Sequence, residues 1–183
     1  MRKLRILVVA IFSLVTFNVS AQIGIGGTLG LTMPMGDLGD GLNTGLGFNV
    51  MGKYSLSENM AVGASVGYSS FGTESENFSF GVIPITGLFE YSFGSGVFKP
   101  YLGSDLGLYM FRTKVTFFGN SSSSSDTYFG FAPTGGVMYE ISNNLSICGN
   151  LKYNMVFAKD ALDNSTTSTW LGINAGIIFK LGK

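Results

Sequence analysis

The feature that most constrains this chain is an alternation of apolar residues with small or polar ones, which recurs in eight segments. The segments are residues 22–32, 45–54, 60–71, 81–93, 100–111, 128–141, 145–157 and 169–181. A period of two places the two kinds of side chain on opposite faces of a β-strand. Each segment is long enough to cross a membrane as a tilted strand, which needs about 9–11 residues.

Strands with one apolar and one polar or glycine-bearing face predict a barrel in a membrane. The composition agrees, because glycine supplies 27 of the 183 residues and charged residues only 12%, about half the usual share. After residue 21, no apolar segment approaches the length of a membrane helix, about 20 residues. Backbone groups in lipid must all be paired, so the sheet has to close on itself. The sequence therefore predicts an all-β fold, an eight-stranded antiparallel up-and-down transmembrane β-barrel.

The connections between the segments alternate between short and long. Residues 55–59, 94–99 and 142–144 are short and turn-like, whereas 33–44, 72–80, 112–127 and 158–168 are longer and more polar. Short periplasmic turns and long outer loops are typical of outer-membrane barrels. Within the third long connection, Ser121 to Ser125 form a low-complexity run, which we expect to be a mobile loop tip.

The first 21 residues have the pattern of a cleavable signal peptide. Arg2, Lys3 and Arg5 precede an apolar run over residues 6–17, and Val19-Ser20-Ala21 fits the small-x-small cleavage rule. We therefore expect a signal peptide at 1–21 and a barrel domain at 22–183. The alternative is an amphipathic anchor that is not cleaved, and the cleavage triplet argues against it.

Several function classes are disfavoured by what the chain lacks. The first 21 residues hold three of the eleven Lys and Arg and none of the eleven Asp and Glu, so the remainder carries a net charge of about −3. It has no basic stripe for nucleic acid. Its single cysteine, Cys148, cannot form an internal disulfide. The chain contains no histidine, the commonest general base and a frequent metal ligand. We expect no enzymatic activity, no cofactor and no metal site.

Charged residues recur on the glycine-bearing face of the predicted strands, which would point into the barrel. They are three cations and three anions: Lys53, Glu90, Asp105, Glu140, Lys152 and Lys180. One interpretation is an ion path or gate, and the other is a plug of salt bridges that fills a narrow lumen. We favour the plug, because eight strands leave an interior just wide enough for side chains and buried charges must be paired.

Two stretches resemble a known family. Residues 84–91 (Pro-Ile-Thr-Gly-Leu-Phe-Glu-Tyr), followed by Lys99-Pro100-Tyr101-Leu102-Gly103, are similar to the central hairpin of the small outer-membrane β-barrel family. That family includes the OmpA/OmpX-type eight-stranded barrels. Residues 135–140, before a short Asn turn, resemble its sixth strand. The resemblance implies the outer membrane of a Gram-negative-type bacterium, with outer-membrane lipid and the outer-membrane assembly machinery as partners. Unlike many such barrels, the chain does not end on an aromatic residue.

The function expected from these patterns is a structural or surface-interaction role, with a side-chain-filled lumen. Phe117 and Phe118, beside Val115, form an exposed-looking apolar cluster in a predicted loop and are candidate contacts for an extracellular partner. The alternative is a narrow channel, or a carrier for small apolar molecules with an apolar pocket under the loops. A soluble lipocalin-like barrel would invert the two faces, but it would have no reason to keep charge off one face of all eight strands.

Overall fold

The computed structural model describes residues 22–73, 78–94, 96–117, 120–159 and 165–181. The predicted signal peptide at 1–21 lies outside these ranges, so its cleavage stays a prediction. Within the described residues, no helix is long and apolar enough to cross a membrane.

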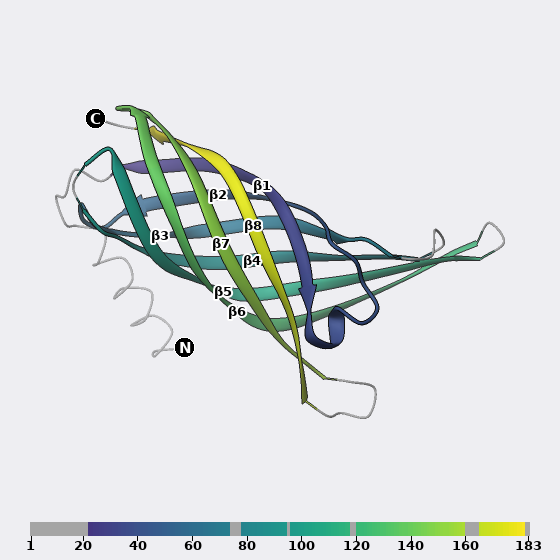
Figure 1. Cartoon of the computed structure of the whole chain (residues 1–183). Helices are drawn as coiled ribbons and strands as arrows, with labels where there is room; N and C mark the ends of the chain where they lie inside the picture. The colour runs from purple at the N-terminus through teal and green to yellow at the C-terminus, as the bar shows by residue number, and fades with distance from the viewer. Residues whose placement is uncertain (1–21, 74–77, 95, 118–119, 160–164, 182–183) are drawn as a thin grey trace, which may run out of the picture.

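The described chain forms one closed sheet of eight antiparallel strands, each paired with the next in sequence (Figure 1). β8 pairs with β1 from Ile23↔Leu181 to Met35↔Thr169, which closes the barrel. The predicted fold is therefore confirmed. The strands are β1 Ile23–Met35, β2 Gly45–Ser55, β3 Met60–Phe71, β4 Phe78–Ser92, β5 Phe98–Phe117, β6 Asn120–Ser142, β7 Leu145–Lys159 and β8 Ser165–Leu181, with a short 3-10 helix, η2, at Gly36–Leu38.

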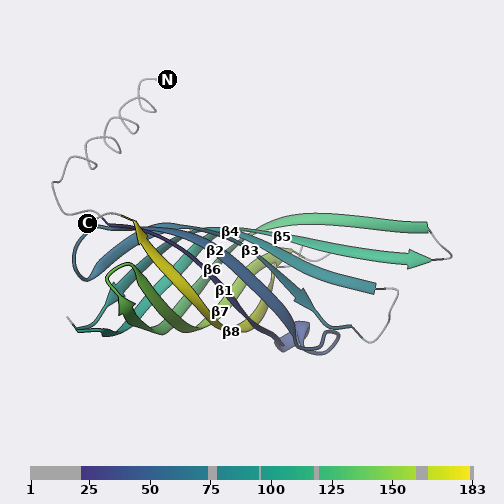
Figure 2. The same ribbon diagram turned by 90° about the horizontal axis from the view of Figure 1, so that it is seen from above.

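The barrel has two unlike ends. The short connections between β2 and β3, β4 and β5, and β6 and β7 lie at the end where β1 begins and β8 stops, which we call the turn end (Figures 1 and 2). The opposite end, which we call the loop end, carries the connections between β1 and β2, β3 and β4, β5 and β6, and β7 and β8.

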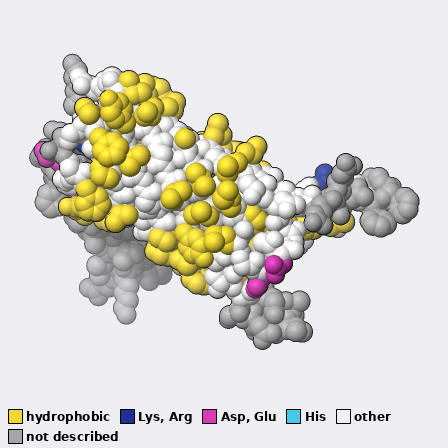
Figure 3. All heavy atoms as spheres, in the orientation of Figure 1, with side chains coloured by type: hydrophobic (Ala, Val, Ile, Leu, Met, Phe, Trp, Pro, Cys, Tyr) yellow, Lys and Arg dark blue, Asp and Glu magenta, His cyan; other side chains and the backbone are white. Residues whose placement is uncertain are grey.

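The alternation places side chains as predicted. Outward residues such as Leu29, Leu46 and Leu106 are more than half exposed, whereas Thr28, Lys53 and Asp105 on the other face are buried. Hydrophobic side chains gather over the wall of the barrel in Figure 3. A soluble barrel would bury these leucines and expose Lys53 and Asp105, so the burial pattern contradicts the lipocalin-like alternative.

The strands extend further at the loop end than predicted. The expected irregular loop over 112–127 is wrong, because the β5–β6 ladder continues from Arg112↔Ser125 to Phe117↔Asn120. The serine run predicted to be a mobile tip is therefore part of β6. With the start of β4, which pairs from Phe78↔Val115, the two strands form a three-stranded ribbon that projects beyond the barrel (Figures 1 and 2). We call residues 78–81, 112–117 and 120–127 the ribbon.

Two prolines interrupt the ladders inside the wall. Pro84 pairs with Tyr109 of β5, but the β3–β4 ladder passes from Val66↔Ile85 directly to Ser69↔Val82. Pro133 pairs with Ser104 of β5, but the β6–β7 ladder passes from Phe131↔Met155 directly to Thr134↔Lys152. Proline has no N–H to donate, so each gap lies on the side where that donor would be needed.

Candidate functional site in the barrel interior

The turn end of the barrel opens into a polar vestibule of about 570 Å³. The side chains of Lys99 and Lys180 converge there on Glu140, and both ammonium groups donate to the same carboxylate oxygen, Oε1. The three side chains come from β5, β8 and β6, and each is about one-fifth exposed. The vestibule therefore holds two cations on one anion, within reach of solvent.

A second ion pair lies deeper in the vestibule. The Nζ atom of Lys53 on β2 lies 2.7 Å from both carboxylate oxygens of Glu90 on β4. The two strands flank β3, where Gly63 is the ladder partner of Lys53 and leaves room for the pair. The ammonium group of Lys53 also lies 5.5 Å from the centre of the Tyr101 ring, a cation–π distance.

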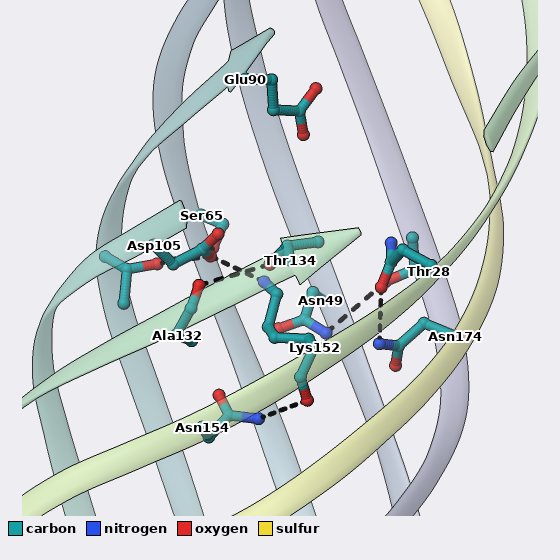
Figure 4. A network of polar contacts seen from close by, with 12 residues as sticks. Thr28, Asn49, Ser65, Glu90, Asp105, Ala132, Thr134, Lys152, Asn154 and Asn174 are labelled. Carbon is teal, nitrogen blue, oxygen red and sulfur yellow. Dashed lines mark hydrogen bonds and ion pairs between the residues drawn. The ribbon is translucent and has the colours of Figure 1, made fainter. Parts of the chain in front are cut away.

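A third ion pair lies at the middle of the barrel. The Nζ atom of Lys152 on β7 lies 2.7 Å from Oδ2 of Asp105 on β5. The same oxygen accepts hydrogen bonds from the hydroxyls of Thr86, at 3.1 Å, and Ser65, at 3.4 Å. One buried carboxylate oxygen thus collects three donors from three strands, and in Figure 4 the side chains of Asp105, Ser65 and Lys152 point toward one another.

Uncharged polar side chains continue at the level of this pair. The side-chain amide of Asn174 donates to Oδ1 of Asn150 at 2.9 Å. The side-chain amide of Asn49 donates to the hydroxyl of Thr28 at 3.5 Å (Figure 4). Asn154 donates to the backbone carbonyl of Lys152 at 3.3 Å. These bonds satisfy polar groups that would otherwise be costly to bury.

The loop half of the interior is apolar and aromatic. Its centre is a cluster of buried side chains, with other aromatic and leucine side chains packed around it: Phe71, Val82, Tyr109, Val156 and Trp170 at the centre, and Leu38, Leu42, Phe80, Phe111 and Tyr128 around them. The rings meet edge to face, as in Phe71–Trp170 at 5.9 Å and 89° and Tyr109–Trp170 at 5.7 Å and 79°. We call these ten residues the aromatic cluster. Such ring geometry is favourable beyond the area it buries.

All six charged residues named from the sequence lie on the inner face, and the structure pairs each cation with an anion. Strand stagger is not readable from sequence, so these pairings were not predicted. Lys99 was missed because β5 was expected to begin at residue 100, although Lys99 shares the odd-numbered, inward positions of Tyr101 and Asp105. The aromatic cluster was also missed. Tyr109 and Phe111 also have odd numbers and therefore point inward, but the strands were expected to end at or near these positions.

Of the two predicted loop contacts, the structure describes only Phe117, and it lies in a strand. Phe117 is the last residue of β5, not part of a loop, and Phe118 lies outside the described residues. Phe117 belongs to the ribbon. The β6 edge of the ribbon is unpaired within the described chain, because β6 pairs with β7 only from Phe129↔Phe157 toward the turn end. Asn120–Tyr128 thus leaves one side of its backbone without a strand partner.

The described residues offer no evident metal centre, since no three His, Cys, Asp or Glu side chains among them are grouped to hold an ion. What the interior provides is three ion-paired groups below an aromatic cluster.

Comparison with known families and structures places this barrel among outer-membrane proteins. The family model described as "Outer membrane protein beta-barrel domain" matches residues 5–179. A search of curated protein sequences gives no match.

Three solved structures illustrate the likeness of the fold. Neisserial surface protein A (NspA) is 20% identical, with a TM-score of 0.68, and the match covers 89% of this chain and all of that one. OprG, an outer-membrane protein of Pseudomonas aeruginosa, is 16% identical, with a TM-score of 0.58 and 90% and 97% coverage. Ail, the attachment invasion locus protein of Yersinia pestis, is 20% identical, with a TM-score of 0.55 and 88% and 97% coverage.

Proposed function

Because this chain belongs to the outer membrane protein β-barrel family, we propose that it acts at the bacterial surface as a non-enzymatic anchor whose ribbon binds an extended segment of an extracellular protein. The barrel holds the ribbon in the outer membrane, and its own side chains close its interior. The short connections and both ends of the described chain belong on the periplasmic side, which directs the ribbon outward.

The observation that carries this proposal is the unpaired β6 edge of the ribbon. Asn120–Tyr128 presents a row of backbone N–H and C=O groups on the side facing away from β5. Natural proteins usually protect such an edge with lysine, proline or a bulge, and here Asp126 is the one charged residue along it. An edge of this kind binds extended peptides by strand addition, in which main-chain hydrogen bonds supply the affinity.

The order of the side chains along the interior supports the closed interior that we propose. An eight-stranded barrel is just wide enough for side chains to fill. A solute that entered at the turn end would meet Glu140 with its two lysines and then the Lys53–Glu90 pair. Beyond the Asp105–Lys152 pair it would meet the aromatic cluster, where Val82 and Val156 are fully buried and Trp170 is 1% exposed. Breaking the ion pairs inside the wall is costly, so the interior supports an anchor better than a channel.

Absence of histidine from all 183 residues supports a non-enzymatic role. The carboxylates that a reaction could use as a base, Glu90, Asp105 and Glu140, are each bound by a lysine. Each of these carboxylates is therefore occupied by an ion-pair partner and is not free to contact a substrate.

The second candidate function, a carrier that releases small apolar molecules sideways, is supported by one observation. A groove of about 380 Å³ lies in the wall where Pro133 interrupts the β6–β7 ladder. It is lined mainly by apolar residues, among them Leu102, Pro133, Leu151 and Leu171. A carrier also needs an apolar pocket under the loops, and in this barrel the aromatic cluster occupies that space.

Strand addition can be tested with a library of random peptides displayed on phage and the protein held in lipid nanodiscs. We expect selected peptides to be extended and to protect the backbone amides of residues 120–128 from hydrogen exchange. Protection confined to other loops, or no selected peptide, would contradict the proposal.

Two neighbouring proline variants provide the matched control. Successive N–H groups of a strand point to opposite sides, so Ser123→Pro and Ser124→Pro each remove one donor, from opposite sides of β6. The variant that removes a donor on the free edge should keep the ribbon and lose peptide binding, since proline is tolerated there. Equal binding by both variants would contradict strand addition at this edge.

A further inference from the structure

The outward face of β4, β5 and β6 changes from apolar to basic at one level of the barrel. Met110 is the last apolar outward residue of β5 and pairs with Ile83 and Thr127. The next outward residues are Arg112 and Lys114, both exposed. Their ladder partners on this face are small: Gly81 and Ser125 beside Arg112, and Ser79 and Ser123 beside Lys114.

These two cations differ from the lysines inside the barrel. Lys53, Lys99, Lys152 and Lys180 are each bound to a carboxylate. Arg112 and Lys114 make no ion pair with any residue that the structure describes. The acidic residues of β4, β5 and β6, which are Glu90, Asp105, Asp126 and Glu140, all lie on the inward face. The outer face of the ribbon is therefore cationic and rich in hydroxyl groups.

The position of this face relative to the membrane can be worked out from strand geometry. A β-strand rises about 3.4 Å per residue, and strands in a membrane barrel are tilted by about 45°. The stretch of β5 from Phe98 to Met110 therefore spans about 29 Å along the membrane normal. The apolar band of a barrel has a similar height, about 25 Å. Arg112 then lies about 5 Å beyond Met110 and Lys114 about 10 Å beyond it. The headgroup region of one leaflet is about 5–7 Å thick, so Arg112 lies at the level of the lipid phosphates, and the long side chain of Lys114 can reach back to that level.

Tyr68 adds a further donor at this level. A Cβ atom placed on Gly81 would lie 2.6 Å from the hydroxyl of Tyr68, so the tyrosine lies against Gly81, the ladder partner of Arg112. Gly81 has no side chain to displace the ring. Guanidinium, ammonium and hydroxyl groups together are the donors that bind phosphate oxygens in proteins.

We infer that Arg112 and Lys114, with the Tyr68 hydroxyl beside them, bind the phosphate groups of anionic lipids in the membrane leaflet at the loop end. The inference depends on the barrel's place in a membrane and not on the strand addition or the closed interior proposed above. It gives the base of the ribbon a lipid contact that fixes its height above the bilayer.

The test is retention of lipid by the purified full-length protein, measured by native mass spectrometry after release from nanodiscs of phosphatidylcholine and phosphatidic acid. Wild type should retain phosphatidic acid selectively. A cation near an anionic surface contributes about 1 kcal/mol, so the double variant R112Q/K114Q should lower the retention constant by up to about thirty-fold. The selectivity of wild type should also fall as salt is raised. Equal retention by wild type and the double variant, or no preference over phosphatidylcholine, would overturn the inference.

A variant with the charges moved to the other face separates a site from general attraction. Arg112→Gln and Lys114→Gln, combined with Ser122→Lys and Ser124→Arg, keeps the net charge of the ribbon but turns its cations inward. This variant should behave like the double variant, and full retention would overturn the inference. Displacement of phosphatidic acid by millimolar inorganic phosphate would also overturn it, because the ligand would then not need to be a lipid. Gel mobility of unboiled samples confirms that each variant still forms a closed barrel.

Discussion

Replacing Lys152 by methionine tests how the middle of the barrel is held together. The substitution keeps the length of the side chain and removes the ammonium group 2.7 Å from Asp105. Asp105 keeps two hydroxyl donors, Thr86 at 3.1 Å and Ser65 at 3.4 Å. Removing one partner of a buried ion pair costs about 3–5 kcal/mol in soluble cores. Because the hydroxyls remain and Lys152 is 14% exposed, we expect a loss of about 2–4 kcal/mol in the free energy of unfolding.

The second variant of this cycle identifies the partner. Asp105→Asn in the Lys152→Met background removes the uncompensated carboxylate, so most of the lost stability should return. The coupling free energy of the two substitutions should be about 2–3 kcal/mol. Glu140→Gln is the matched control. It belongs to a different ion-paired group, and its effect should add to that of Lys152→Met within about 0.5 kcal/mol.

The assay is a urea titration of folding into lipid vesicles, followed by tryptophan fluorescence and by gel mobility. If Asp105→Asn destabilised the Lys152→Met variant further, the Asp105–Lys152 ion pair would not be stabilising the middle of the barrel. The account of the closed interior would then be wrong. The same reasoning would fail if Glu140→Gln rescued Lys152→Met as well as Asp105→Asn does.

Three further predictions follow from the wall, the aromatic cluster and the closed interior. Leu106→Arg should cost about 2–4 kcal/mol because Leu106 faces lipid, whereas Val115→Arg, on the other face of β5 and beyond the barrel, should be nearly neutral; equal effects in a vesicle-folding titration would contradict the placement of Leu106 against lipid. Trp170→Ala removes the single tryptophan, so its titration is followed by gel mobility alone; it should cost about 3–5 kcal/mol, and a loss below 1 kcal/mol would show that the aromatic cluster is loosely packed. Wild type should conduct almost no current in a planar bilayer, and a large, steady conductance would favour the channel alternative instead.

The barrel itself could be predicted because its signal is local. Alternation over ten or more residues marks each strand, and it also decides which side chains face lipid. The strand of residues 60–71 was predicted with the bounds that β3 has. Faces follow from parity alone, so Lys53 and Asp105 could be placed inside without knowing how the strands pair.

The contents of the barrel could not be predicted to the same depth, because they depend on stagger between strands. Lys152 and Asp105 lie on strands that are separated by β6, and their meeting requires a register that no short stretch of sequence encodes. The ribbon was missed for a different reason. A run of five serines has weak strand propensity, and here it is held in β6 by pairing with residues 112–116 of β5.

The single tryptophan of the chain provides a natural reporter of how the barrel closes. Trp170 lies on the last strand, yet its ring contacts Phe71 of β3 and Tyr109 and Phe111 of β5, from much earlier in the chain. These rings can surround it only when the last strand has crossed the open side of the sheet and met the first. The final change in its emission during refolding should therefore time the sealing of the β1–β8 seam, separately from the arrival of the earlier hairpins in the bilayer.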